Sequence, residues 1–464
     1  MTFDPLFAGA LVLLAAVSFW LAPRAVDADG FFKGWSRNGP PGLLTLTFSQ
    51  VTTWIFARSL LTAAILGYYY GIAGGLAYTA YYLSFLTGGA IVRAIRFRHG
   101  FESVQAFLHD RFGRGGVACY NVVIGVRLLS EVFANLLVIG IIFGETGTTP
   151  YVAAIVALAV VTLAYSMMGG LQASLRTDVF QMAAFLVVFA VVLGALFTQD
   201  LFSAGAIFAS SPDVTEPGWV LLAVAGLQVW SYPLHDPVMM DRGFIADERT
   251  TRRSFRHAAW ISMVCILGFS LLGVHAGLNA LDGETLTVSL ERLLGSQTMI
   301  FVNLALIVSA VSTLDSTLSS SAKLACADMK LCAANVRNGR IAMALFMLGG
   351  LAFLFGGTKD LYAAVAVSGT ASMYLAPVIF FSIWRGAARV DMWAYYVSFA
   401  TAMAGAALYY TEAGGLSDVV GPLTGVEHKY AKLLVISGIV LIAGNAAFVL
   451  GGALKRPVDN PITD

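Results

Sequence analysis

The chain has 464 residues, of which 58% are hydrophobic and only 12% are Asp, Glu, Lys or Arg. This composition excludes an ordinary soluble globule, and the net charge of +1 gives no reason to expect a nucleic-acid partner. The charges fall in short clusters between apolar stretches of about twenty residues, the length that a helix needs to cross a bilayer. We therefore predict an all-α polytopic protein that sits in a lipid bilayer.

About thirteen transmembrane helices are predicted from hydropathy and from the charged breaks between apolar stretches. The first is expected to be a retained helix rather than a cleaved signal peptide, because no positive side chain precedes it. A short amphipathic helix at the membrane interface is predicted between Arg98 and Arg114, where apolar residues recur at helical spacing. In chain order the thirteen predicted helices are 5–22, 43–71, 72–97, 117–143, 150–168, 177–198, 217–236, 257–281, 297–327, 340–357, 360–384, 391–410 and 431–454.

The Lys and Arg residues are distributed unequally between the two sides that thirteen helices define. Three of the 28 fall within helices and 21 lie on one side, which leaves only Arg292, Lys359, Lys429 and Lys432 on the other. Because cytoplasmic loops are enriched in Lys and Arg, we predict a cell-membrane protein whose N-terminus is outside and whose C-terminus is cytoplasmic.

Polar side chains crowd the first half of the second predicted helix. Threonines beside Ser and Gln weaken a helix and can satisfy a broken backbone, whose free carbonyl oxygens can coordinate a cation. The alternative is ordinary packing, since Ser and Thr are common between membrane helices. The polar residues of this run are Thr45, Thr47, Ser49, Gln50, Thr52 and Thr53.

The ninth predicted helix carries a strip of hydroxyl groups on one face. Ser309, Ser312, Thr313 and Ser316 recur at spacings of three and four residues, and Asp315 adds a carboxylate near that face. Such hard oxygen ligands suit a small cation such as Na⁺, whereas serines that merely pack between helices would not need the carboxylate. Polar groups buried in a membrane protein are expensive, and they favour a role in transport.

The segment before the sixth predicted helix contains Gly169 and Gly170, which mark a turn. Thr177 or Asp178 would then be a reasonable N-cap for the following helix. The alternative for Asp178 is a role linked to an ion, and the sequence leaves both interpretations open.

Together these segments resemble the sodium/solute symporter family, whose members take up sugars, proline, pantothenate, carboxylates, iodide or urea. The resemblance spans most of the chain. The motifs that carry it are Gly-Gly-Leu…Thr-Asp-Val…Gln at 169–181, Ser-Thr-Leu-Asp-Ser at 312–316, and Tyr-Pro-Leu-His-Asp-Pro at 232–237 followed by Asp-Arg-Gly at 241–243.

The resemblance implies the leucine-transporter-type fold, in which two repeats of five helices are inverted relative to each other. The whole chain would then be a single transmembrane domain. Helix 5–22 would be an extra N-terminal helix, the repeats would cover 43–198 and 217–384, and two C-terminal helices would lie within 391–454. The interrupted helices would be 43–71 and 217–236, with Pro233 as a plausible breaker of the second.

The same resemblance implies where ions bind. The principal Na⁺ site would consist of the backbone carbonyls of Phe48, Val51 and Ser309 with the side chains of Ser312 and Thr313. A second ion site, present in some members, would fall on Asp178, Asp315 and Ser316. Asp315 departs from the serine of the family pattern, and two carboxylates near one cation can instead take a proton.

The solute is expected between the two interrupted helices, near the midplane of the membrane. Aromatic residues would form the walls and Gln50 would exchange hydrogen bonds with the solute. Arg127 and Glu131 are four residues apart and can pair within one helix, whereas Arg58 needs a partner from another helix or a substrate carboxylate. The predicted solute-binding residues are Gln50, Thr53, Trp54, Tyr81, Tyr82 and Trp230.

The main expectation is therefore Na⁺-coupled symport of a small polar solute into the cytoplasm by alternating access, with no enzymatic activity and no catalytic residues. An H⁺-coupled symporter of the same fold is an alternative. A membrane sensor is another, and it would require a partner protein because the chain ends about ten residues after its last predicted helix. An uncoupled channel or facilitator is a further alternative, and no obligate protein partner is evident.

Overall fold

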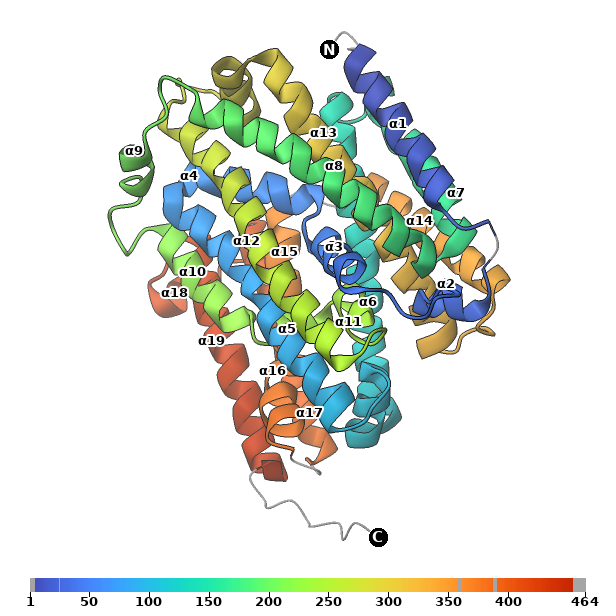
Figure 1. The fold of residues 1–464 in the computed structure, drawn as a ribbon. Helices are drawn as coiled ribbons and strands as arrows, with labels where there is room; N and C mark the ends of the chain where they lie inside the picture. Colours follow the sequence, from blue (N-terminus) through green and yellow to red (C-terminus); the bar gives the residue numbers. More distant parts are fainter. Residues whose placement is uncertain (1–4, 25, 357–360, 387–389, 454–464) are drawn as a thin grey trace.

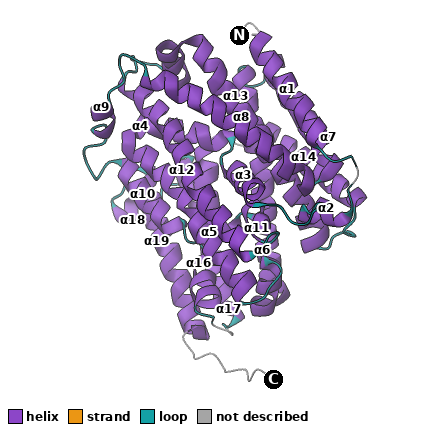
Figure 2. Cartoon of the chain, in the orientation of Figure 1, coloured by secondary structure: helices purple, strands orange, loops and turns teal. Residues whose placement is uncertain are grey.

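The computed structural model describes residues 5–24, 26–356, 361–386 and 390–453, which form a bundle of helices (Figure 1). Within these residues helices are joined by loops and no β-strand is present (Figure 2). The prediction of an all-α fold is confirmed.

The helices of the first half overlap the first six predicted ranges. Turns of 3-10 or π type follow α4 at Tyr81–Leu83 and α5 at Arg93–Arg98. The helices are α1 (Pro5–Leu21), α2 (Ala28–Lys33), α3 (Leu43–Trp54), α4 (Ala57–Ala80), α5 (Ser84–Val92), α6 (Val104–Phe143), α7 (Thr149–Gly169) and α8 (Leu171–Phe197).

The helices of the second half overlap the remaining predicted ranges. Turns of π type extend α13, α16 and α19 through Leu324–Asp328, Val378–Trp384 and Val449–Ala453. The helices are α9 (Ala204–Phe208), α10 (Pro217–Gln228), α11 (Pro237–Gly243), α12 (Glu248–Leu278), α13 (Leu286–Lys323), α14 (Val336–Gly356), α15 (Leu361–Ser372), α16 (Leu375–Pro377), α17 (Met392–Ala413), α18 (Val420–Thr424) and α19 (Lys429–Phe448).

The second predicted helix is interrupted at Ile55 and Phe56, between α3 and α4. Ile55 has φ −85° and ψ 76°, which is not a helical conformation. In the last turn of α3, Thr52 Oγ1 donates a hydrogen bond to Ser49 O at 3.0 Å. Such side-chain bonds to the backbone compete with helix continuation, so the threonine-rich sequence explains why the helix stops here. The predicted interruption is confirmed.

The other predicted interruption separates α10 from α11. A 3-10 turn at Tyr232–His235 contains Pro233, and Pro237 occupies the first turn of α11. Asp236 caps α11 by accepting the backbone N–H of Met239 at 2.9 Å. Proline and a capping carboxylate therefore set the position of this break.

The boundary between the second and third predicted helices is a sharp turn inside α4. Gly71 has φ +57°, a left-handed conformation that favours glycine. The backbone N–H of Ile72 donates to Ser210 Oγ at 2.8 Å, and that of Ala73 donates to Ser211 Oγ at 3.2 Å. These serines bond the backbone amides that the turn frees.

Close helix packing places α3 at the centre of the molecule. α4 and α12 run against each other, and a Cβ atom added to Gly67 or Gly273 would collide with the backbone of the opposite helix. Small residues allow this close approach between membrane helices. α13 packs along α8, and α3 contacts α8, α11, α12 and α13 (Figure 1).

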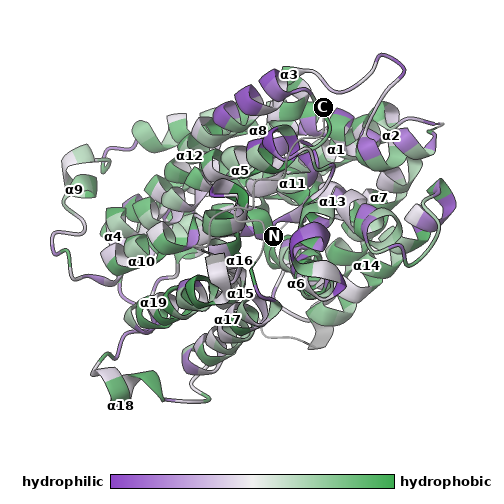
Figure 3. Ribbon diagram, turned by 90° about the horizontal axis from the view of Figure 1, so that it is seen from below, coloured by the Kyte–Doolittle hydropathy of each residue, from purple (hydrophilic) through white to green (hydrophobic). Residues whose placement is uncertain are grey.

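Seven helices in the described part of the chain are long and apolar enough to cross a membrane, and three shorter apolar helices accompany them. Hydrophobic residues make up most of the helical ribbon, while hydrophilic residues gather mainly at helix ends and connecting segments (Figure 3). α1 begins at one end of the bundle and α19 ends at the other (Figure 1). The count of thirteen spans and the inside–outside direction stay predictions.

The predicted amphipathic helix is the first part of α6, which bends at Gly113, where φ is +59°. Its apolar residues Val104, Phe107 and Leu108 are buried within the protein. The apolar face therefore packs on the protein's own core, and the position of this helix at the membrane interface stays a prediction. Some predicted helix ends and charges lie outside the described residues. They are residues 357, 360 and 454 and the side chains of Lys359, Arg389, Lys455 and Arg456.

Candidate ion and solute site

The C-terminal end of α3 faces the hydroxyl strip of α13. Ser309 Oγ donates a hydrogen bond to Ile55 O. Thr313 Oγ1 donates to Thr52 O at 2.9 Å or to Ser309 O at 3.0 Å. Because a helix C-terminus carries partial negative charge and unpaired carbonyls, oxygens from two helices meet here at a position that favours a cation.

Two carbonyls of the predicted Na⁺ site lie slightly earlier on α3. Val51 O accepts the backbone N–H of Ile55 at 2.9 Å, and Phe48 lies about one helical turn before Thr52. The α13 hydroxyls therefore contact the carbonyls of Thr52 and Ile55, whereas the resemblance pointed to Phe48 and Val51. Of the other three predicted residues, Ser309 and Ser312 line a small cavity together with Thr52 and Ile55. Thr313 contacts the end of α3 through Thr52 O.

Asp178 lies fully buried between α3 and α13. Its carboxylate accepts hydrogen bonds from Ser49 Oγ of α3 at 2.6 Å and from Ser312 Oγ of α13 at 2.8 Å. Ser174 Oγ of its own helix is 3.3 Å away. Asp178 therefore links three helices and joins the hydroxyl strip to α8.

The structure overturns one of the two interpretations of Asp178. α8 begins at Leu171 with Gly170 as its N-cap, so Thr177 and Asp178 lie inside the helix and neither caps it. Gly170 has φ +56° and stands at the turn predicted for the glycine pair. The helix continues six residues upstream of the predicted start, because Gly170, rather than the polar pair, ends the preceding helix.

A second carboxylate, Asp315, lies near Asp178 and is also fully buried. Its Oδ2 accepts hydrogen bonds from Tyr165 OH and from Thr177 Oγ1, both at 2.8 Å. Its Oδ1 has no hydrogen-bond partner among the described residues. A buried carboxylate oxygen without a partner is costly unless it is protonated or approached by a cation.

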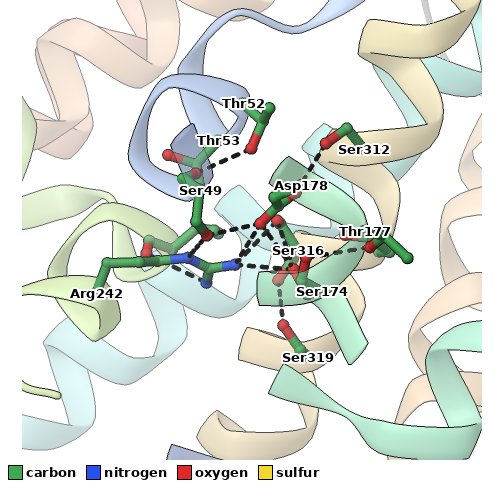
Figure 4. Close-up of polar contacts among 12 residues, drawn as sticks. Ser49, Thr52, Thr53, Ser174, Thr177, Asp178, Arg242, Ser312, Ser316 and Ser319 are labelled. Atoms are coloured by element: carbon green, nitrogen blue, oxygen red, sulfur yellow. Dashed lines mark hydrogen bonds and ion pairs between the residues drawn. The ribbon is translucent and has the colours of Figure 1, made fainter. Parts of the chain in front are cut away.

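The guanidinium of Arg242 fills the space beside Asp178 (Figure 4). Arg242 is 0% exposed, although its position near the end of α11 had placed it among the predicted inner-loop charges. We call the guanidinium and the polar groups around it the Arg242 pocket, whose other members are Ser49, Ser174, Asp178, Ser316 and Ser320.

A separate small cavity lies between the two interrupted helices. Three of the predicted solute-binding residues line it, and the rings of Trp54 and Tyr82 pack edge to face with centroids 5.7 Å apart. Tyr81 OH donates to Gln228 Oε1 at 2.8 Å, and Tyr82 OH donates to Trp54 O at 2.7 Å. The lining residues are Trp54, Phe56, Ser59, Tyr78, Tyr81, Tyr82, Arg127 and Tyr232.

The other predicted solute-binding residues do not line this cavity. Gln50 and Thr53 are buried on α3, and the Gln50 amide has no hydrogen-bond partner among the described residues. Trp230 is 42% exposed and packs against Phe380 and Trp384. Their roles stay predictions.

Four charged residues form a buried network next to this cavity. Arg58 Nη2 is 2.9 Å from Glu131 Oε1, which also pairs with Arg127. Arg127 Nη2 lies 3.2 Å from Asp236 Oδ2. The partner that Arg58 required from another helix is thus Glu131 of α6. We call Arg58, Arg127, Glu131 and Asp236 the ion-pair network, and its four charges cancel.

The sequence did not single out several residues that the site contains. Arg242 and Asp236 belong to short motifs that resembled the family, but nothing in their neighbourhood indicated that they would be buried. Ser174 precedes Asp178 by four residues, and this helical spacing became informative only once the true start of α8 was known.

Comparisons with solved structures identify the fold. The chain superposes on a Na⁺-coupled sialic acid symporter, captured in a substrate-bound outward-open state, with a TM-score of 0.67. The alignment covers 96% of this chain and 97% of that one at 14% sequence identity. The chain has the fold of this transporter.

Two further structures share this fold at low sequence identity. Mhp1, a nucleobase-cation-symport-1 family transporter with bromovinylhydantoin bound, matches with a TM-score of 0.61 at 15% identity, over 93% of this chain and 95% of that one. A manganese transporter of Eremococcus coleocola matches with a TM-score of 0.52 at 12% identity, over 88% and 94% of the two chains. No protein-family model and no curated protein sequence matches the chain.

Proposed function

We propose that this protein is a secondary transporter of the sodium/solute symporter type. It couples the entry of Na⁺ to the uptake of a small polar solute across the cell membrane by alternating access. The proposal is supported by the shared fold, by the oxygen cluster between α3 and α13, and by the aromatic cavity between the interrupted helices.

One observation carries the proposal: the last turn of α3 contributes both to the oxygen cluster with α13 and to the aromatic cavity. The carbonyls of Thr52 and Ile55 face the hydroxyls of α13, while Trp54, between them in sequence, lines the aromatic cavity. A cation that binds these oxygens holds the end of α3 against α13 and fixes Trp54 in the wall of the cavity. Ion binding and solute binding thereby stabilise the same conformation, which is the condition for coupling.

The solute would be held by aromatic walls and a few polar groups. Trp54, Tyr81 and Tyr82 form the walls in this proposal, with Gln50, Thr53 and Trp230 as further candidates. Trp54 Nε1 and Arg127 Nε have no hydrogen-bond partner among the described residues, so both are available as donors to an oxygen of the solute. The ion-pair network holds Arg127 in place.

Two measurements test this function. A thermal-shift screen of small polar solutes in NaCl and in KCl identifies a solute, and uptake of that solute into proteoliposomes follows. Uptake driven by an inward Na⁺ gradient, and lost when choline replaces Na⁺, is the expected result. Equal uptake in Na⁺ and choline would leave a facilitator, and the symporter proposal would fail.

Asp315 supports a second candidate, in which a proton is the coupling ion. Its buried Oδ1 has no partner among the described residues, and protonation would remove the cost of that charge. An H⁺-coupled transporter would accumulate solute under an inward pH gradient without Na⁺, and Asp315→Asn would abolish that accumulation. Accumulation that requires Na⁺ at every pH would exclude this candidate.

A further inference from the structure

The Arg242 pocket has the chemistry of a cation site. The guanidinium donates from Nε to Ser49 Oγ at 3.1 Å, and from Nη2 to Ser174 Oγ at 3.1 Å and Ser316 Oγ at 2.9 Å. From Nη1 it reaches Ser320 Oγ at 3.4 Å. Four hydroxyl oxygens thus surround one positive charge, as they would surround a desolvated monovalent ion.

The counter-charge of the pocket is Asp178. Its Oδ2 lies 4.0 Å from Arg242 Nη2, and both side chains are fully buried. The serines contribute oxygens from α3, α8 and α13, whereas Arg242 comes from α11 after the second interruption. The guanidinium of Arg242 therefore reaches the pocket from a fourth helix, α11, and contacts side chains of the other three helices.

We propose that the Arg242 guanidinium is a tethered cation that permanently occupies the position of a second transported ion, so that each transport cycle couples only one Na⁺. This inference rests on the proposed function in one respect, the identity of the coupling ion. The contacts that carry it concern Asp178 and Ser316, two of the three residues predicted for a second ion site.

The charge balance of the region supports a single exchangeable cation. Asp178 and Asp315 supply two negative charges and Arg242 supplies one positive charge. Arg242 is the ion-pair partner of Asp178, and no ion pair of Asp315 lies within 4.0 Å among the described residues. One monovalent cation at the end of α3 would bring the total to zero, whereas two would leave an excess positive charge in a low-dielectric interior.

Arginine suits this role better than a titratable group. A guanidinium stays protonated under all physiological conditions, so its charge cannot be lost during the cycle. Its planar fork of donors matches several oxygens at once, which a lysine ammonium matches less well. The pocket therefore keeps its cation whichever side of the membrane is open.

The test is equilibrium binding of ²²Na⁺ to the purified full-length protein, which needs no solute. The wild type is expected to bind one Na⁺ per chain. Arg242→Gln removes the tethered charge and keeps a polar side chain, so it is expected to bind two. Arg242→Lys retains a cation in the pocket and is expected to bind one.

Arg96→Gln is the matched control, because Arg96 contacts the same end of α11 without entering the pocket. Its Nη1 donates to Gly243 O at 3.1 Å and to Ala246 O at 2.5 Å. This variant is expected to bind one Na⁺, as the wild type does. Low-millimolar methylguanidinium should return Arg242→Gln from two bound Na⁺ to one, because it refills the pocket.

The outcomes separate this inference from the proposed function. Two Na⁺ bound by the wild type, or an unchanged number in Arg242→Gln, would overturn the tethered cation. A wild type that binds none would refute Na⁺ coupling, and the gain or absence of one site in Arg242→Gln would still decide the inference. If Arg242→Gln does not fold, it is purified in methylguanidinium, and Na⁺ binding is measured after the methylguanidinium is removed. Two bound Na⁺ would then support the tethered cation, and one would overturn it.

Discussion

Two buried charge clusters lie close to α3, one through Ser49 and one beside Trp54, and they differ in one respect. In the ion-pair network, two arginines and two carboxylates cancel. In the Arg242 pocket and the adjoining Asp315, two carboxylates face one arginine. A balanced cluster is complete by itself and serves as a structural joint. An unbalanced one would be neutralised by a further cation, and in the proposed function it is the place where an ion enters and leaves.

Breaking the ion-pair network should have the largest effect on stability. Glu131→Gln leaves Arg58 and Arg127 without their shared carboxylate, and losing one partner of a buried pair costs about 3–5 kcal/mol. Denaturation of the purified protein measures this loss. Glu248→Gln is the control, because its ion pair with Arg93 is exposed and worth about 0–1 kcal/mol. Equal losses in the two variants would mean that the network is not a structural joint.

A change among the α13 hydroxyls that face the end of α3 should alter Na⁺ affinity more than stability. Thr313→Ala removes a hydroxyl that points at the end of α3. Losing one such ligand should cost about 1.4 kcal/mol of binding free energy, which raises the Na⁺ concentration for half-saturation by about tenfold. Na⁺ binding to the purified protein measures it.

Thr317→Ala is the matched control for that variant. Thr317 Oγ1 is equally buried but donates within α13, to Thr313 O at 2.8 Å. Its Na⁺ affinity should stay close to that of the wild type. An unchanged affinity in Thr313→Ala would remove this hydroxyl from the ion site.

A third charge cluster, outside the membrane-spanning helices, should show the smallest effect. Hydrogen bonds from Arg292 and from the backbone N–H of Leu281 lower the pKa of Glu284 to about 2. Tyr68 OH also donates to Glu284 O at 2.8 Å, which ties this loop to α4. Because the pKa is lowered in the folded state, the carboxylate stabilises the loop above its ordinary value of 4.5, and this is lost as the pH falls towards 2.

Hydrogen exchange of the loop between α12 and α13 measures that effect. Exchange corrected for its intrinsic pH dependence should increase in the wild type as the pH falls below about 4.5. Glu284→Gln should exchange faster at neutral pH and change little on acidification. The same acid dependence in both proteins would show that Glu284 does not hold the loop.

The sequence predicted both interruptions because local chemistry determines them. Threonines that bond their own backbone end α3, and Pro233 stands in the turn before α11. The hydroxyl strip of the ninth predicted helix could be predicted equally well, because helical spacing alone places Ser309 and Thr313 on one face. These features need no knowledge of the tertiary structure.

The remaining features depend on which helices meet. Arg242 precedes a basic loop, and only the packing of α11 against α3 shows that it turns inward. Trp230 lies within the second interruption, as a solute-binding residue would, yet it faces Phe380 and Trp384. Hydropathy gives the depth of a residue in the membrane but not the direction of its side chain, so these contacts could not be predicted.

Thermal unfolding of the purified protein in NaCl and in KCl at equal ionic strength tests most directly whether α3 and α13 hold Na⁺. A ligand that binds only the folded state raises the unfolding temperature. The wild type should be more stable in NaCl than in KCl, and Ser309→Ala/Thr313→Ala should lose that difference. Identical unfolding of the wild type in the two salts would contradict a Na⁺ site between these helices.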